Sequence, residues 1–131
     1  MIGIALVLRL RGAKVTEAQR GSIEAAGVAI RRAPADVAAL ASVAATLPLG
    51  ELKTRVDAFV HDNFDPVYDA QEALVQSQGF AKYAAHTGPW ASGERMVYRA
   101  WSAATDGHRP EAVASLREAI PHFEEAARAF A

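Results

Sequence analysis

The 131-residue sequence predicts an all-α fold, a single-domain helical bundle of about five to six helices spanning residues 1–131. This length is close to that of one ordinary domain and too short for two. Hydrophobic residues make up 51% of the chain and charged residues 22%, a composition typical of globular rather than disordered proteins. Thirty residues are alanine, the strongest helix former, whose small side chain also lets helices pack closely.

The first ten residues are the ambiguous element. Apolar residues occupy every second position from Ile2 to Leu10, which is the alternation typical of a strand. Because the sequence contains no convincing second strand to pair with it, we favour a helix over residues 2–10. If the segment is a lone strand instead, we expect it to pair between subunits. A signal peptide is not expected, because no basic residue precedes the apolar run.

The next two predicted helices are divided by a proline. A helix over residues 16–32 begins with a capping box formed by Thr16 and Gln19. Pro34 ends it, because proline disfavours helical geometry at the residue before it. A second helix covers residues 34–47 and is apolar nearly all round, so we place it in the middle of the fold.

The third helix is predicted over residues 50–63 from the apolar stripe formed by Leu52, Val56, Phe59 and Val60. Asp65 and Pro66 then have the order of an N-cap and first-turn residue, so a fourth helix is expected over residues 65–86. Gly79 is a candidate break within it, and Gly88-Pro89 is expected to end it.

Ser92 is the predicted cap of a fifth helix, whose end is marked by Gly107. A sixth helix begins at Pro110, and its apolar residues follow a heptad stripe: Val113, Leu116, Ile120, Phe123, Ala127 and Phe130. Pro121 lies beside this stripe and is expected to kink the helix.

Charge is unevenly distributed, with a net +4 over residues 1–34 and −5 over residues 35–131. The basic N-terminal part has the charge to meet a phosphate backbone, or to dock on the acidic run Asp57, Asp62, Asp65, Asp69 and Glu72. With only three lysines in the chain and no aromatic residue among the N-terminal arginines, nucleic-acid binding is not expected.

Several classes of protein are disfavoured by what the sequence lacks. It contains no cysteine, which excludes disulfides, thiolate zinc sites and a cysteine nucleophile, and which fits a cytoplasmic setting. The longest nearly apolar stretch, residues 37–49, is shorter than the roughly 20 residues of a membrane span. We therefore expect a soluble, cytoplasmic protein that does not bind membranes.

Two acid–histidine pairs have the spacing of metal ligands on one helix face: Asp57 with His61, and Glu118 with His122. A di-iron bundle would show Glu-x-x-His on two helices, and that motif does not occur in the sequence. The favoured interpretation is two surface pairs that each stabilise their own helix slightly. No metal and no other cofactor is predicted.

An aromatic region between Phe80 and His108 is the candidate small-ligand pocket. Flat rings around a few polar groups are typical of such pockets, and two arginines one turn apart have the charge to hold an anion. The alternative is that these aromatics belong to the core. The candidate ligand-binding residues are Tyr83, His86, Trp90, Arg95, Tyr98, Arg99, Trp101 and His108.

The sequence shows no phosphate-binding glycine loop, no nucleophile-elbow serine and no HExxH metal motif. We therefore predict a non-catalytic helical module for protein–protein interaction or assembly. The alternative is a small-ligand-binding regulatory domain that uses the aromatic region between Phe80 and His108.

Both ends of the chain are apolar, although chain ends usually fray unless something holds them. We therefore predict a homodimer whose interface includes Ile2, Leu6, Phe123 and Phe130. The competing interpretation is a monomer in which both ends pack on the central helix, residues 37–47.

Overall fold

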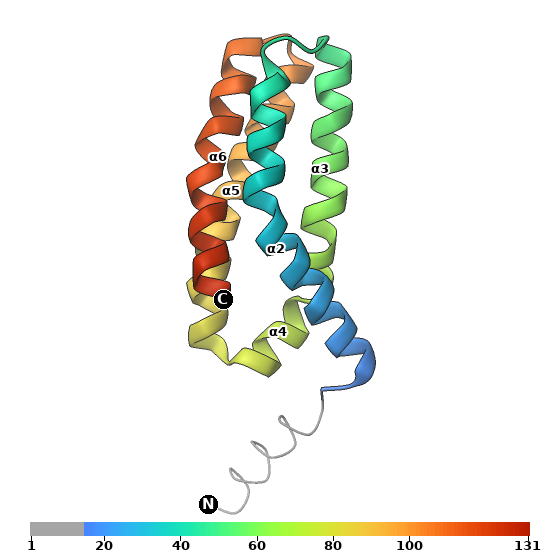
Figure 1. Cartoon of the computed structure of the whole chain (residues 1–131), viewed down its shortest axis with the longest axis vertical. Coiled ribbons are helices and arrows are strands. Elements are labelled where there is room, and N and C mark those ends of the chain that lie inside the picture. Colours follow the sequence, from blue (N-terminus) through green and yellow to red (C-terminus); the bar gives the residue numbers. More distant parts are fainter. Residues whose placement is uncertain (1–14) are drawn as a thin grey trace, which may run out of the picture.

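The computed structural model describes residues 15–131 as an antiparallel helical bundle, which confirms the all-α prediction (Figure 1). The described elements are α2 (Glu17–Ala44), α3 (Leu49–Asp69), α4 (Gln71–Gln78), α5 (Phe80–Thr105) and α6 (Arg109–Phe130). The four long helices alternate in direction, and α4 joins α3 to α5 at one end of the bundle (Figure 1). The prediction made for residues 2–10 lies outside the described residues.

Helix α2 begins as predicted, but it does not stop at Pro34. Gln19 N donates to Thr16 Oγ1 at 3.1 Å and Thr16 N donates to Gln19 Oε1 at 2.8 Å, which confirms the capping box. The predicted break at Pro34 is wrong, because α2 runs through it as one helix. Ile30 and Val37 are both fully buried on either side of the proline. Packing on both sides offsets the roughly 3 kcal/mol that an internal proline costs a helix.

Helix α3 likewise continues through Pro66, so the predicted new helix at residue 65 is also wrong. Proline has no backbone N–H, and the carbonyl of Asp62, four residues earlier, therefore loses its usual helical partner. Arg32 of α2 replaces it, because its Nη2 donates to the Asp62 carbonyl oxygen at 2.8 Å. This hydrogen bond also connects α2 to α3.

Two glycines with positive φ separate the remaining helices, as the sequence indicated. Gly79 (φ +82°) lies between α4 and α5, and Gly107 (φ +79°) follows α5. Gly107 N donates to Ala104 O and His108 N donates to Ala103 O, the hydrogen-bond pattern of a Schellman motif. Helix α6 begins at Arg109, next to the predicted Pro110, and continues through Pro121.

The predicted stop at Gly88-Pro89 and the predicted cap at Ser92 are wrong, because α5 is helical throughout Phe80–Thr105. His86, Trp90 and Val97 are buried at helical spacing across the proline, so a continuous buried face stabilises the uninterrupted helix. Residues 86–92, which lie between the predicted end of one helix and the predicted cap of the next, are therefore about two turns of helix.

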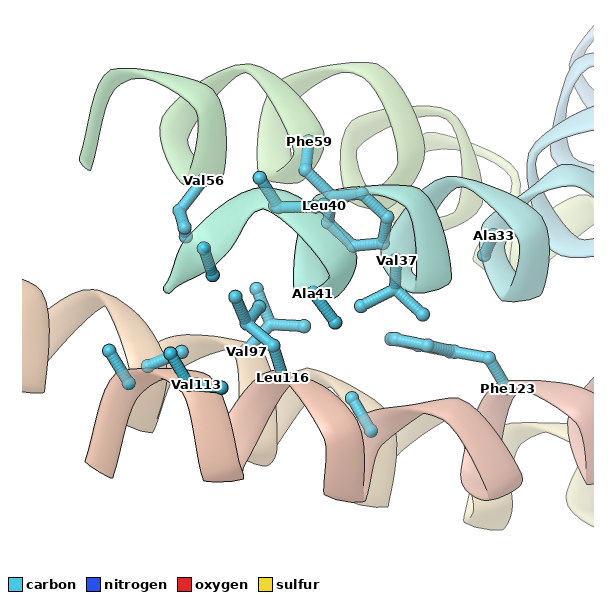
Figure 2. Close-up of a cluster of buried hydrophobic side chains, with 14 of the residues drawn as sticks. Ala33, Val37, Leu40, Ala41, Val56, Phe59, Val97, Val113, Leu116 and Phe123 are labelled. Carbon is cyan, nitrogen blue, oxygen red and sulfur yellow. The ribbon is translucent and has the colours of Figure 1, made fainter. Parts of the chain in front are cut away.

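The core is centred on Phe123 of α6, which is fully buried. Its ring centroid lies 4.9 Å from that of Trp90, 5.9 Å from Phe59 and 6.0 Å from Phe64. Figure 2 shows the Phe123 side chain reaching from α6 toward Val37 of α2. Aromatic residues from α3, α5 and α6 thus meet at one level of the bundle.

No helix within residues 15–131 combines the length and the apolar character that crossing a membrane requires.

Candidate interaction surfaces

The predicted aromatic region is divided between the core and the surface. Trp90 is 3% exposed and packs edge-on against Phe64, with ring centroids 5.6 Å apart. His86, one turn earlier, is 1% exposed. These two residues therefore belong to the packed interior of the bundle.

His86 connects α4, α5 and α6. Its Nε2 lies 2.7 Å from Gln78 Oε1, at hydrogen-bonding distance. The rings of Tyr83 and Phe130 pack edge-on against it, with centroids 5.4 and 5.1 Å away. Burial lowers the pKa of His86 below its usual value, and the positive charge of Lys82 lowers it further. The neutral imidazole therefore forms part of the structural contact among three helices.

Tyr98 and Trp101 lie on the other side of α5, where they meet α3. Trp101 Nε1 donates to Asp57 Oδ1 at 2.6 Å, and Lys53 Nζ lies 4.9 Å from the centroid of the Trp101 rings. Tyr98 is 49% exposed and packs against Phe64. The predicted site did not include their α3 partners, Lys53, Asp57 and Phe64. No local sequence pattern indicates which helix packs against α5.

Burial raises the pKa of Tyr98, and the carboxylates of Glu94 and Asp65 raise it further. Burial also raises the pKa of Glu94, and neighbouring Arg95 opposes that shift. An acidic and aromatic surface therefore runs along the contact between α3 and α5.

The remaining predicted ligand-binding residues are exposed or bonded locally. Arg95 Nη2 donates to Ser92 Oγ at 3.0 Å within α5, and Arg99 is exposed. His108 is exposed where the chain enters α6. The structure therefore does not bring these three residues together with the buried pair His86 and Trp90.

The histidine pairs differ from the predicted ones. His61 Nδ1 lies 2.7 Å from Asp65 Oδ2, one turn after it, while Asp57 is bonded to Trp101. Within residues 15–131 no group of three or more histidine and carboxylate side chains is arranged to hold a metal ion.

The predicted dimer residues have different environments. Ile2 and Leu6 lie outside the described residues. Phe123 is fully buried between helices of its own chain. Phe130 is partly buried and packs against His86, and its ring also reaches the backbone of Gly27. The apolar stripe of α6 is thus covered within one chain as far as its last turn.

Exposed aromatic side chains flank α4 at one end of the bundle. Tyr68, near the end of α3, is 76% exposed, and Phe80, the first residue of α5, is 75% exposed. A mostly apolar hollow beside α4 is lined by Gln71, Glu72, Val75 and Gln76. We call Tyr68, α4 and Phe80 the α4 end.

A groove runs along the contact between α2 and α3 and consists of two hollows that share Asp62. The lower hollow, at the end of α3 that precedes α4, is lined by Ser22, Ala25, His61, Asp62, Asp65, Pro66 and Asp69. The upper hollow includes a mostly apolar surface formed by Ala39, Leu40, Val43, Ala58 and Phe59. We call the two hollows together the α2–α3 groove.

Arg32 bridges the two helices where the hollows meet. Besides its bond to the Asp62 carbonyl, its Nε donates to Asn63 Oδ1 at 3.0 Å and lies 3.2 Å from Asp36 Oδ2. Asn63 is 1% exposed, and its Nδ2 donates to the Phe59 carbonyl at 3.1 Å. This network fixes the spacing of α2 and α3 at the centre of the groove.

No family model matches the chain, and none of the curated proteins or solved structures compared with it is significantly similar.

Proposed function

We propose that this chain is a non-catalytic helical module that binds another protein or a second copy of itself through the α4 end. The observation that carries the proposal is the exposure of Tyr68 and Phe80, two aromatic rings on either side of α4. Buried aromatic anchors contribute a large share of the binding energy at protein interfaces. In the single chain both rings are exposed to water, so burying them in a complex is favourable.

The hollow beside α4 supports the same surface. Val75 contributes to it, and Gln71 and Gln76 supply side-chain amides that can donate and accept hydrogen bonds. A mostly apolar hollow on α4, the helix that the two exposed aromatic residues flank, together with hydrogen-bonding side chains in its lining, has the composition of a protein interface.

The arrangement of the titratable residues gives less support to catalysis. His61 and His108 are exposed on different elements, and His86 is enclosed by aromatic rings. The small-ligand alternative also gains less support, because its predicted residues are divided between the core and the surface.

The proposal is tested with a tagged full-length chain expressed in its native host and analysed by native mass spectrometry after gentle purification. We expect species heavier than the tagged monomer, whose mass is that of the 13.9 kDa chain plus its tag. These species should be lost in the double variant Tyr68→Ser/Phe80→Ser. Tyr98→Ser, which removes a half-exposed aromatic ring on the α3–α5 surface, is the matched control and should retain them.

Circular dichroism establishes that each variant is folded. A wild-type chain that is found only at the mass of the tagged monomer would overturn the proposal. It would equally be overturned if the double variant kept the heavier species.

A further inference from the structure

We propose that residues 1–14 of this chain bind in the α2–α3 groove of the same chain, with their basic residues against the lower hollow. This inference concerns a different surface from the α4 end and does not depend on the proposed function.

Charge complementarity is the first argument. The lower hollow presents the carboxylates of Asp62, Asp65 and Asp69, all on exposed residues. Among the ion pairs of residues 15–131, Asp65 pairs with His61, whereas the carboxylates of Asp62 and Asp69 take part in none. Arg32 contacts Asp62 through its backbone carbonyl. A segment that brings positive charge to this hollow would therefore be stabilised by carboxylates that the bundle itself leaves unneutralised.

Residues 1–14 carry that charge and no acid. Their basic residues are Arg9, Arg11 and Lys14, all in the part of the segment nearest the bundle. The described chain starts at Val15, and α2 then runs from Thr16 past Ser22 and Ala25, which line the lower hollow. The basic part of the segment is therefore attached close to the acidic part of the groove.

The order of residue types along the segment matches the order of surfaces along the groove. Beyond the basic residues, toward residue 1, the sequence is apolar from Leu8 to Ile2. Beyond the acidic lower hollow, past Arg32, the upper hollow presents Ala39, Val43 and Ala58 over the buried side chains of Leu40 and Phe59. A segment that reverses direction at Val15 places its basic residues beside the carboxylates of the lower hollow and its apolar residues beside the apolar surface of the upper hollow.

The segment is long enough for this path. Along α2, Leu40 lies roughly 36 Å from Thr16, at about 1.5 Å per helical residue. Fourteen residues span at most about 46–50 Å when fully extended. Reach therefore permits contact with both hollows.

The absence of cysteine from the chain allows the proposal to be tested by engineered disulfides in the full-length protein. Ala5→Cys supplies a thiol in the segment and Ala58→Cys supplies one in the upper hollow, at an exposed position. The matched control pairs Ala5→Cys with Glu124→Cys, an exposed position on α6. Glu124 and Ala58 lie at the same level of the bundle, because their neighbours Phe123 and Phe59 pack against each other. A disulfide forms only when the two Cα atoms approach within about 7 Å.

Under mild oxidation at low salt, we expect the Ala5→Cys/Ala58→Cys chain to form an intramolecular disulfide at least tenfold faster than the control pair. Non-reducing electrophoresis separates this product from a disulfide-linked dimer. Adding Asp62→Asn, Asp65→Asn and Asp69→Asn should slow formation of the intramolecular disulfide about tenfold. Adding Glu111→Gln, Glu118→Gln and Glu125→Gln, an equal charge change on exposed positions of α6, should leave the rate unchanged.

Equal rates for the two cysteine pairs would overturn the proposal, as would equal slowing by the two sets of charge changes. A product consisting only of linked dimers would assign the groove to a second copy instead, and would also overturn it. None of these results bears on the mass of complexes formed through the α4 end.

Discussion

Gly93 of α5 is the position where one added methyl group should have the clearest effect on stability. A Cβ atom there would lie 2.4 Å from Phe123 Cε1 and 2.7 Å from Cδ1 and Cζ of the same ring. The ring has little room to move, because it is fully buried and packs against the rings of Phe59, Phe64 and Trp90. Gly93→Ala therefore requires α5 and α6 to separate or the aromatic cluster to repack.

Two opposing effects set the size of the change. Replacing glycine by alanine inside a helix favours folding by about 1 kcal/mol. Overpacking a close-packed core costs about 1–3 kcal/mol, and the contact with three ring atoms of Phe123 places this site toward the upper part of that range. We expect Gly93→Ala to lower the free energy of unfolding by about 1–2 kcal/mol, equivalent to roughly 4–8 °C in melting temperature.

Urea denaturation followed by circular dichroism measures the change, with Gly21→Ala as the matched control. Gly21 is exposed in α2, and a Cβ there would meet no atom within 4 Å, so this substitution should stabilise the protein by about 0.5–1 kcal/mol. In a Phe123→Leu background the cost of Gly93→Ala should shrink, because the smaller side chain vacates the space. Stabilisation by Gly93→Ala comparable to that by Gly21→Ala would refute the reasoning.

Two further predictions concern His86 and Arg32. Because burial lowers the His86 pKa, the unfolded chain binds its proton first as pH falls, so stability contributed by neutral His86 is present above about pH 6.5 and is lost below it. The urea midpoint of the wild type should therefore fall more between pH 7.5 and 5.5 than that of His86→Gln, and parallel pH profiles would contradict this. Arg32→Met should cost about 1 kcal/mol in the wild type and measurably less in a Pro66→Ala background, where a backbone N–H at position 66 again reaches the Asp62 carbonyl. A double-mutant cycle of urea midpoints tests this second prediction, and additive effects would show that Arg32 does not replace the missing donor.

The helix ends that depend on local backbone chemistry could be predicted from the sequence. The capping box at Thr16 and the positive φ of Gly107 are both present in the structure. Each depends on a side chain or a conformational freedom within a few residues of the helix end, so the pattern and its cause lie in the same short segment. The start of α6 beside Pro110 was predictable for the same reason.

The candidate surfaces were less predictable, because each depends on which helices are neighbours. Trp101 was identified as a candidate, but its bond to Asp57 requires α3 to lie beside α5, and 44 residues separate the two partners. The α2–α3 groove could not be read from either helix alone. The acidic run from Asp57 to Glu72 was visible in the sequence, yet its position beside Ser22 and Ala25 depends on how α3 packs against α2.

The misplaced helix boundaries at Pro34, Pro66 and Pro89 have a common physical cause. A proline removes one donor and crowds the carbonyl four residues earlier, and each predicted boundary rests on this local cost. The burial of apolar residues is a longer-range term, and it continues at steps of three and four across Pro34 and Pro89. This periodicity is present in the sequence. The apolar residues that continue across each proline favour an unbroken helix by more than the proline disfavours it.

At Pro66 the hydrogen bond that the helix loses lies within the α2–α3 groove. The carbonyl that Pro66 leaves without a helical donor belongs to Asp62, the residue shared by both hollows of the α2–α3 groove. Arg32 occupies that carbonyl from α2, and the same guanidinium group bonds Asn63 and Asp36. In a helix without Pro66, Arg32 would share that oxygen with a backbone N–H and would no longer be its main donor. The local defect in α3 thus supplies the hydrogen bond that joins the two walls of the groove, and Arg32 separates its acidic level from its apolar one.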